Sequence, residues 1–124
     1  MVNQVLLYLG SLFPLFWGIA HLFPTRSVVE GFGDISLDNK RIITMEWIIE
    51  GVSLIFIAVI VSSVTYIDYM SVISKTIYWI SFVMLNTLSV ISLFTGFKVS
   101  FLPFKLCPVI FTTSSILILL GSYI

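Results

Sequence analysis

The sequence predicts an all-α membrane protein, an antiparallel bundle of four transmembrane helices with a short amphipathic segment between the first two. Of the 124 residues, 59% are hydrophobic and 10% are charged, and the mean hydropathy is +1.15, whereas soluble domains carry about 25% charged residues. Four apolar runs each approach the roughly 20 residues that cross a hydrocarbon core of about 30 Å. They predict helices at about residues 5–23, 39–63, 75–97 and 104–123 within a single membrane domain, residues 1–124.

The first predicted helix is expected to be retained and not cleaved as a signal peptide. Its start, Met1 to Gln4, carries no basic residue, and the helix runs into HLFPT where a signal peptide would have a small-residue cleavage site. Pro24 ends the helix, because proline disfavours helical geometry in the residue before it. In the link that follows, Thr25 to Gly31 predicts a short amphipathic turn at the membrane surface.

The other three helices are bounded by polar or proline-containing turns. Asp38 is placed to cap the second helix, with its carboxylate near the positive helix end. Ser62 to Ser74 predicts a turn with tyrosines at interface depth. The fourth helix is expected to begin between Pro103 and Pro108, since proline is tolerated in a first turn. Connections this short join antiparallel neighbours.

Two carboxylates interrupt the second apolar run. Glu46 and Glu50 stand four residues apart and therefore share one helix face. From Ile42 to Val61 the twelve Leu, Ile, Val and Phe residues favour insertion by roughly 4 to 7 kcal/mol in total. Two acids facing lipid would oppose it by roughly 5 to 7 kcal/mol. We therefore expect both carboxylates to face the protein interior and to have polar partners.

Depth along the helices predicts those partners. At about 1.5 Å per residue, His21 and Glu46 fall in one layer near the headgroups, and Glu50 and Asn86 fall in a deeper one. Glu50 is then expected to be neutral, because burial disfavours the charged form of a carboxyl group. Asn86 is expected to face inward, because its amide needs a hydrogen-bond partner in hydrocarbon. Trp17 lies on the same face as His21. The predicted ligand-binding residues are thus Trp17, His21, Glu46, Glu50 and Asn86, and the candidate catalytic residues are His21, Glu46 and Glu50.

Several classes of function are disfavoured. The formal net charge is zero, which gives no reason to expect nucleic acid as a partner. Cys107 is the single cysteine, so neither an intramolecular disulfide nor a dithiol motif is available. The Glu-x-x-His motifs of di-iron bundles are missing, and we expect no metal. His21 and Glu46 could also be an interhelical pair that only fixes the packing.

WGIAHLFPT, followed in the second helix by MEWIIEGVSLIFIAVIV, resembles the DoxX-like group of small bacterial four-helix membrane proteins. The likeness covers roughly Leu6 to Val61. It implies the four-helix fold and, for some members, an association with quinone-linked redox complexes.

The predicted function is that of an inner-membrane protein whose His/Glu pocket binds a small lipophilic or quinone-like ligand, or that serves as accessory subunit of a membrane redox enzyme. One alternative is an enzyme that moves a proton on a lipid substrate, with Glu46 or Glu50 as acid or base and His21 as partner. The other is a structural subunit of a membrane complex. Besides the bilayer, the expected partners are a lipid or quinone ligand, a membrane protein complex or a second copy of the chain.

The loop charges predict the orientation. Five of the six basic residues lie on the side of the first and third links: Arg26, Lys40, Arg41, Lys98 and Lys105. By the positive-inside rule, both termini are expected outside.

Overall fold

The computed structural model covers residues 1–124, and all its regular elements are helices. In chain order they are α1 (Val2–Leu22), α2 (Thr25–Glu30), α3 (Leu37–Asp68), α4 (Val72–Phe94), the 3₁₀ turn η1 (Gly96–Lys98) and α5 (Leu102–Tyr123). Four stretches, namely α1, α3, α4 with η1, and α5, are long and apolar enough to cross a membrane. The predicted fold class is confirmed, and its features are those of a multi-pass membrane protein.

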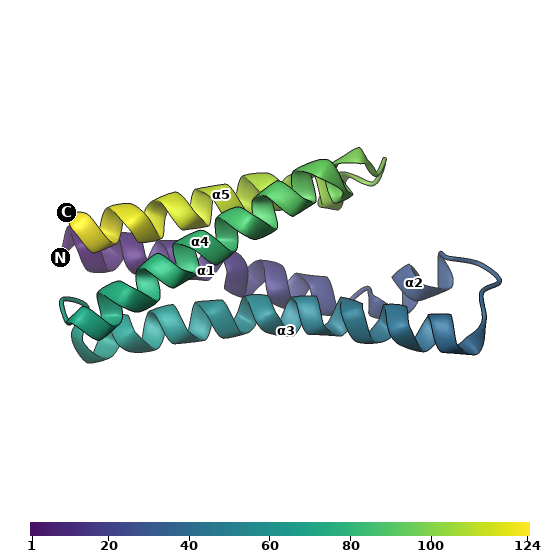
Figure 1. Ribbon diagram of the computed structural model, residues 1–124, viewed down its shortest axis with the longest axis horizontal. Coiled ribbons are helices and arrows are strands. Elements are labelled where there is room, and N and C mark those ends of the chain that lie inside the picture. Colours follow the sequence, from purple (N-terminus) through teal and green to yellow (C-terminus); the bar gives the residue numbers. More distant parts are fainter.

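The four long helices run antiparallel, and both termini lie at one end (Figure 1). Helix α1 packs against both α3 and α5, and α4 packs mainly against α5. Helices α3 and α4 share few contacts, because α4 moves away from α3 after their connecting turn and crosses toward α5 (Figure 1). At the end that holds α2 and η1, α3 and α4 therefore stand apart.

Two predictions about the ends of α3 are wrong. Ser36, not Asp38, caps α3, since its hydroxyl accepts a hydrogen bond from the Asn39 amide (3.2 Å), and Asp38 lies in the first turn. The turn expected at residues 62–74 is only Tyr69 to Ser71, because the polar residues before it are accommodated within α3. Thr65, for example, donates to the Val61 carbonyl of its own helix (2.6 Å).

The fourth membrane helix begins slightly earlier than predicted. Helix α5 starts at Leu102 with Pro103 in its first turn, and it continues through Pro108, which is buried inside the helix. The carbonyl of Pro108 accepts a hydrogen bond from the Ser89 hydroxyl on α4 (3.0 Å). This contact helps to fix α5 against α4 at the level of the proline.

Helix α3 is longer than a bilayer requires. Its 32 residues extend for about 48 Å, against a hydrocarbon core of about 30 Å. If Asp68 marks one interface, about 20 residues back toward the start of α3 reach Ile48. That placement puts the first turns of α3 at the level of the headgroups. These turns lie beside α2 (Figure 1).

Glycines bring α1 close to both neighbours. A Cβ atom at Gly18 would lie 2.7 Å from the carbonyl oxygen of Gly51 on α3, and one at Gly10 would lie 2.8 Å from Ile118 on α5. Ser114 on α5 donates to the Gly10 carbonyl (2.6 Å). Small residues and interhelical hydrogen bonds are the usual means of helix association in lipid.

The short amphipathic segment takes the predicted form. Helix α2 ends at Glu30, and the backbone amide of the next residue, Gly31, donates to the Ser27 carbonyl (3.0 Å). On its exposed side, Arg26 donates to the Glu30 carboxylate (2.8 Å), and this hydrogen bond raises the pKa of Arg26. Val28 lies on the other side and faces the bundle, where it forms part of a cavity wall.

Candidate functional site

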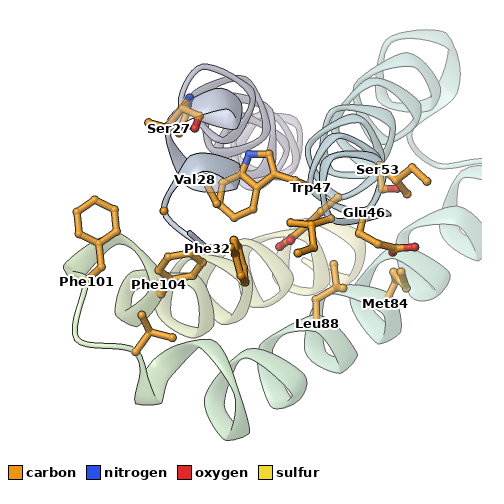
Figure 2. Close-up of a pocket in the computed structure, with 16 residues that line it drawn as sticks. Ser27, Val28, Phe32, Glu46, Trp47, Ser53, Met84, Leu88, Phe101 and Phe104 are labelled. Carbon is orange, nitrogen blue, oxygen red and sulfur yellow. Dashed lines mark hydrogen bonds between the residues drawn. The ribbon is translucent and has the colours of Figure 1, made fainter. Parts of the chain in front are cut away.

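A cavity of about 1020 Å³ lies where α3 and α4 stand apart (Figure 2). Residues of α2 and of the segment between η1 and α5 line its mouth, at the end of the bundle away from the termini (Figure 1). Its wall is mostly apolar and includes several aromatic rings. The lining residues are Pro24, Ser27, Val28, Gly31 and Phe32 near α2, Ile43, Glu46, Trp47, Ile49, Glu50 and Ser53 on α3, Met84 and Leu88 on α4, and Val99, Phe101 and Phe104 near α5.

Both carboxylates of α3 line this cavity. Glu46 and Glu50 lie on the face that Ser53 continues, which is the arrangement that their spacing predicts. Met84 and Leu88 of α4 line the cavity as well, and Figure 2 shows Glu46 on the side of α3 that faces them. No lysine or arginine lines the cavity.

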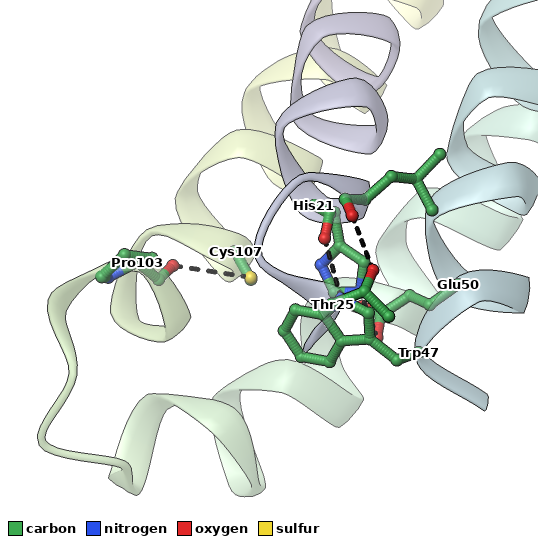
Figure 3. Close-up of polar contacts among 7 residues, drawn as sticks. His21, Thr25, Trp47, Glu50, Pro103 and Cys107 are labelled. Carbon is green, nitrogen blue, oxygen red and sulfur yellow. Dashed lines mark hydrogen bonds and ion pairs between the residues drawn. The ribbon is translucent and has the colours of Figure 1, made fainter. Parts of the chain in front are cut away.

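His21 pairs with Glu50, and the expected pair with Glu46 is not formed. The Nε2 atom of His21 lies 3.5 Å from Oε2 of Glu50 (Figure 3). The His21 side chain is 8% exposed, against 43% for Glu50. The contact does not form a hydrogen bond, so His21 Nε2 is a buried polar atom without a hydrogen-bond partner. Such atoms are rare in folded proteins, since leaving one unpaired costs about 1 to 3 kcal/mol.

The pairing differs from the prediction because α3 extends beyond the membrane. A depth measured from Arg41 assumes that the membrane begins at that residue, and it therefore places Glu50 too deep. In the structure Glu50 is level with His21, which lies one residue before the end of α1 at Leu22. Glu50 therefore lies near the headgroup boundary, one turn inside Glu46, and not at the centre of the bilayer.

Trp47 fixes the position of His21. The two rings stack with centroids 3.7 Å apart and an angle of 17° between their planes. The indole Nε1 of Trp47 also donates to the His21 carbonyl (2.8 Å, Figure 3). This carbonyl belongs to the last turn of α1, where backbone oxygens lack intrahelical partners. Sequence reasoning missed Trp47, although its position beside Glu46 was a usable signal.

A second cavity of about 240 Å³ lies behind Trp47, against α1 and α5. Trp17 and His21 line it together with Cys107, whose thiol donates to the Pro103 carbonyl (3.6 Å, Figure 3). The indole of Trp47 contributes to the walls of both cavities. Trp17 therefore lies near His21, as predicted, but on the side away from Glu46.

Asn86 is not part of the site. Its amide nitrogen donates to the Phe82 carbonyl one turn earlier on α4 (2.8 Å), and its side chain does not line the main cavity. The face of α4 that packs inward carries Ser81, Leu85 and Ser89 instead. The expected Glu50–Asn86 pair is wrong, because an asparagine in a helix can satisfy its amide on its own backbone and need not face a partner helix.

The metal-binding residues and the comparisons with known proteins do not identify a function for the site. No three His, Cys, Asp or Glu side chains lie close enough together to hold a metal ion. No family model, curated protein or solved structure matches the chain. The chemistry available at the site is thus that of two carboxylates, one imidazole and a large apolar and aromatic wall.

Proposed function

We propose that this protein is a bacterial inner-membrane protein that binds a small lipophilic molecule in the cavity between α2, α3 and α4. The observation that carries the proposal is that Glu50, whose carboxylate lies 3.5 Å from the otherwise unpaired His21 Nε2 atom, lines a large and mostly apolar cavity. A ligand with an apolar body and one polar group would suit such a wall, because a few placed polar groups usually orient ligands in apolar pockets.

The resemblance to DoxX-like proteins supports a particular setting for this activity. It suggests a quinone-like ligand and a place beside a membrane redox enzyme as its accessory subunit. We take association with such a complex, or with a second copy of the chain, as part of the proposal.

A proton-transfer activity on a lipid substrate is the second candidate. It is favoured by the distance of 3.5 Å between His21 and Glu50, since an imidazole and a carboxylate in a low-dielectric site are suitable acid and base. Turnover of a lipid by the purified protein alone would separate this enzyme from a binding protein.

The test is to purify the protein from native membranes in one detergent, extract it with organic solvent and identify bound molecules by mass spectrometry. We expect a lipophilic molecule in the wild-type protein and at least a severalfold lower occupancy in Glu50→Gln. The melting temperature of Glu50→Gln should stay close to that of the wild type, because the amide keeps the size and polarity of the side chain.

Glu30→Gln is the matched control. Glu30 is an exposed acid on α2 that pairs with Arg26 outside the cavity, and exposed ion pairs contribute little to stability. This variant should keep both the ligand and the melting temperature. A Glu50→Leu protein that is stable and retains the ligand fully would overturn the proposed site. So would wild-type protein that neither copurifies with a lipophilic molecule nor binds an added lipid or quinone.

A further inference from the structure

Both titratable residues on the wall of the main cavity are acidic. Glu46 has no ion-pair partner, and Glu50 has only His21. A protonated His21 could compensate one of the two carboxylates but not both. The cavity therefore lacks a positive charge to match its acids.

Three of the basic residues near the cavity in the chain are engaged elsewhere. Arg26 binds Glu30 at 2.8 Å, and Arg41 lies 3.8 Å from Asp38. The Nζ of Lys105 donates to the Phe97 carbonyl (2.7 Å) and lies over the Phe97 ring, 4.9 Å from its centroid. Lys40 and Lys98 form no ion pair, but neither of them lines the cavity, so no basic side chain of the protein matches the two acids there.

Aromatic rings surround the same space. Phe32, Trp47, Phe101 and Phe104 line the cavity together with the two acids. Phe104 meets both Trp47 (centroids 5.9 Å apart) and Phe101 (6.1 Å) edge to face. Carboxylates combined with aromatic faces favour an organic cation, through charge pairing and cation–π contacts.

The main cavity continues into an apolar groove between α3 and α4. This groove has a volume of about 510 Å³ and shares Ser53 and Met84 with the main cavity. Its α3 wall runs from Val52 to Ile60, so the groove ends about 15 Å along the helix from Glu50. Phe56 and Ile80 on its rims are each 63% exposed and would face lipid. The groove thus leads from the headgroup level, where the acids lie, toward the middle of the bilayer.

We propose that the occupant is a long-chain amine, with its ammonium group beside Glu46 and Glu50 and its alkyl tail in the groove between α3 and α4. This inference rests on the proposed function, because it names the chemical class of the lipophilic ligand. A quinone fits this wall less well, since its carbonyl oxygens carry no positive charge to match the two acids.

The experiment compares three compounds that share one tail: tetradecylamine, tetradecanol and tetradecanoic acid. Each is titrated calorimetrically into the full-length protein in zwitterionic nanodiscs, and the signal from empty nanodiscs is subtracted. We expect the amine to bind about tenfold more tightly than the alcohol, because charge-assisted hydrogen bonds are about twice as strong as neutral ones. The fatty acid should bind weakest, and hexylamine more weakly than tetradecylamine.

Two variants separate specific binding from partitioning into the bilayer. The double variant Glu46→Gln/Glu50→Gln should lose the preference for the amine, whereas Glu30→Gln should keep it. Thermal unfolding of each variant establishes that it is folded, and Glu46→Gln alone serves if the double variant is not.

The outcomes distinguish the two proposals. If the alcohol, the acid or a short-chain quinone binds at least as tightly as the amine, the cationic head is wrong and lipophilic binding stands. If the amine preference persists in the folded Glu46→Gln protein or in the double variant, the acids are not its cause, and the inference is overturned. If hexylamine binds as tightly as tetradecylamine, the tail does not lie in the groove. If no compound binds and no lipophilic molecule copurifies, the proposed function itself fails.

Discussion

Trp47 joins the end of α1 to α3 by two different contacts. Its ring stacks on His21, and its indole N–H donates to the His21 carbonyl (2.8 Å). The carbonyl would otherwise be one of the unpaired oxygens at the end of a helix. A single side chain therefore both completes α1 and holds the imidazole beside Glu50.

Trp47→Phe tests the contribution of the indole N–H. The phenyl ring can still stack on His21, but the carbonyl loses its donor, so we expect a loss of about 0.5 to 1.5 kcal/mol in stability. The measurement is the melting temperature in one detergent. Trp79→Phe is the control, because the Trp79 ring packs edge to face on Phe82 and Tyr123 at a lipid-exposed site and makes no indole hydrogen bond. An equal loss in both variants would show that ring size and not the hydrogen bond matters.

At this scale, sequence reasoning could predict which residues are unusual but not which of them meet. Two acids and a histidine stand out in an apolar chain, and the spacing of the acids places both on one wall. Which acid pairs with His21 depends on how far α3 extends beyond the bilayer. The composition of the sequence does not reveal that length. Asn86 illustrates the other difficulty, since its amide is satisfied by the Phe82 carbonyl of its own helix.

Close approach of α1 and α3 depends on glycine at both sides of the contact. A Cβ at Gly18 would meet the backbone oxygen of Gly51 at 2.7 Å, whereas one at Gly51 would meet the Leu22 side chain at 2.6 Å and the backbone oxygen of Gly18 only at 3.2 Å. The two positions are therefore not equivalent. A side chain can rotate away, but a backbone oxygen moves only if a helix moves.

We expect Gly18→Ala to destabilise the protein by about 1 to 3 kcal/mol, as overpacking does, and Gly51→Ala to cost less. Alanine also raises helix propensity by up to about 1 kcal/mol. This gain applies to both positions, so the difference between the two variants isolates the contact. Melting temperatures provide the measurement, and Gly96→Ala is the control because its nearest atom would lie at 3.6 Å, an ordinary contact. A Gly51→Ala variant less stable than Gly18→Ala would contradict the argument.

The existence and order of the helices could be predicted well from the sequence. Long apolar runs, prolines and the Thr25 to Gly31 segment were sufficient for this. The ends were less predictable, because serine and threonine fit inside membrane helices when they bond to their own backbone. Thr65 does this in α3, and for that reason the expected turn beginning at Ser62 is helical.

Across the whole molecule, the candidate site results from the unequal packing of the four helices. Helix α1 lies between α3 and α5, and α4 follows α5 away from α3 (Figure 1). Near the connecting turn the two helices still meet, where Thr65 and Tyr78 are hydrogen bonded (3.0 Å). Toward the other end they separate and leave the cavity and groove. The sequence predicts an antiparallel bundle, but the crossing of α4 depends on side-chain packing that no periodicity reveals.

The distribution of charge over the two ends favours one orientation in the membrane. Arg26, Lys40, Arg41, Lys98 and Lys105 lie at the end with α2 and η1, and Lys75 lies at the end with the termini. Cytoplasmic loops carry the excess of lysine and arginine. We therefore propose that the cavity mouth faces the cytoplasm and that both termini lie outside.

Impermeant thiol labelling of intact cells tests this orientation. In a Cys107→Ala background, which removes the one native thiol, we expect Met70→Cys to be labelled, because this residue is 62% exposed in the turn between α3 and α4. Asp34→Cys, in the exposed link before α3, should react only after the cells are permeabilised. The unmodified background gives the level of nonspecific labelling. Labelling of Asp34→Cys but not Met70→Cys in intact cells would reverse the orientation, and the ligand would then reach the cavity mouth from outside the cell.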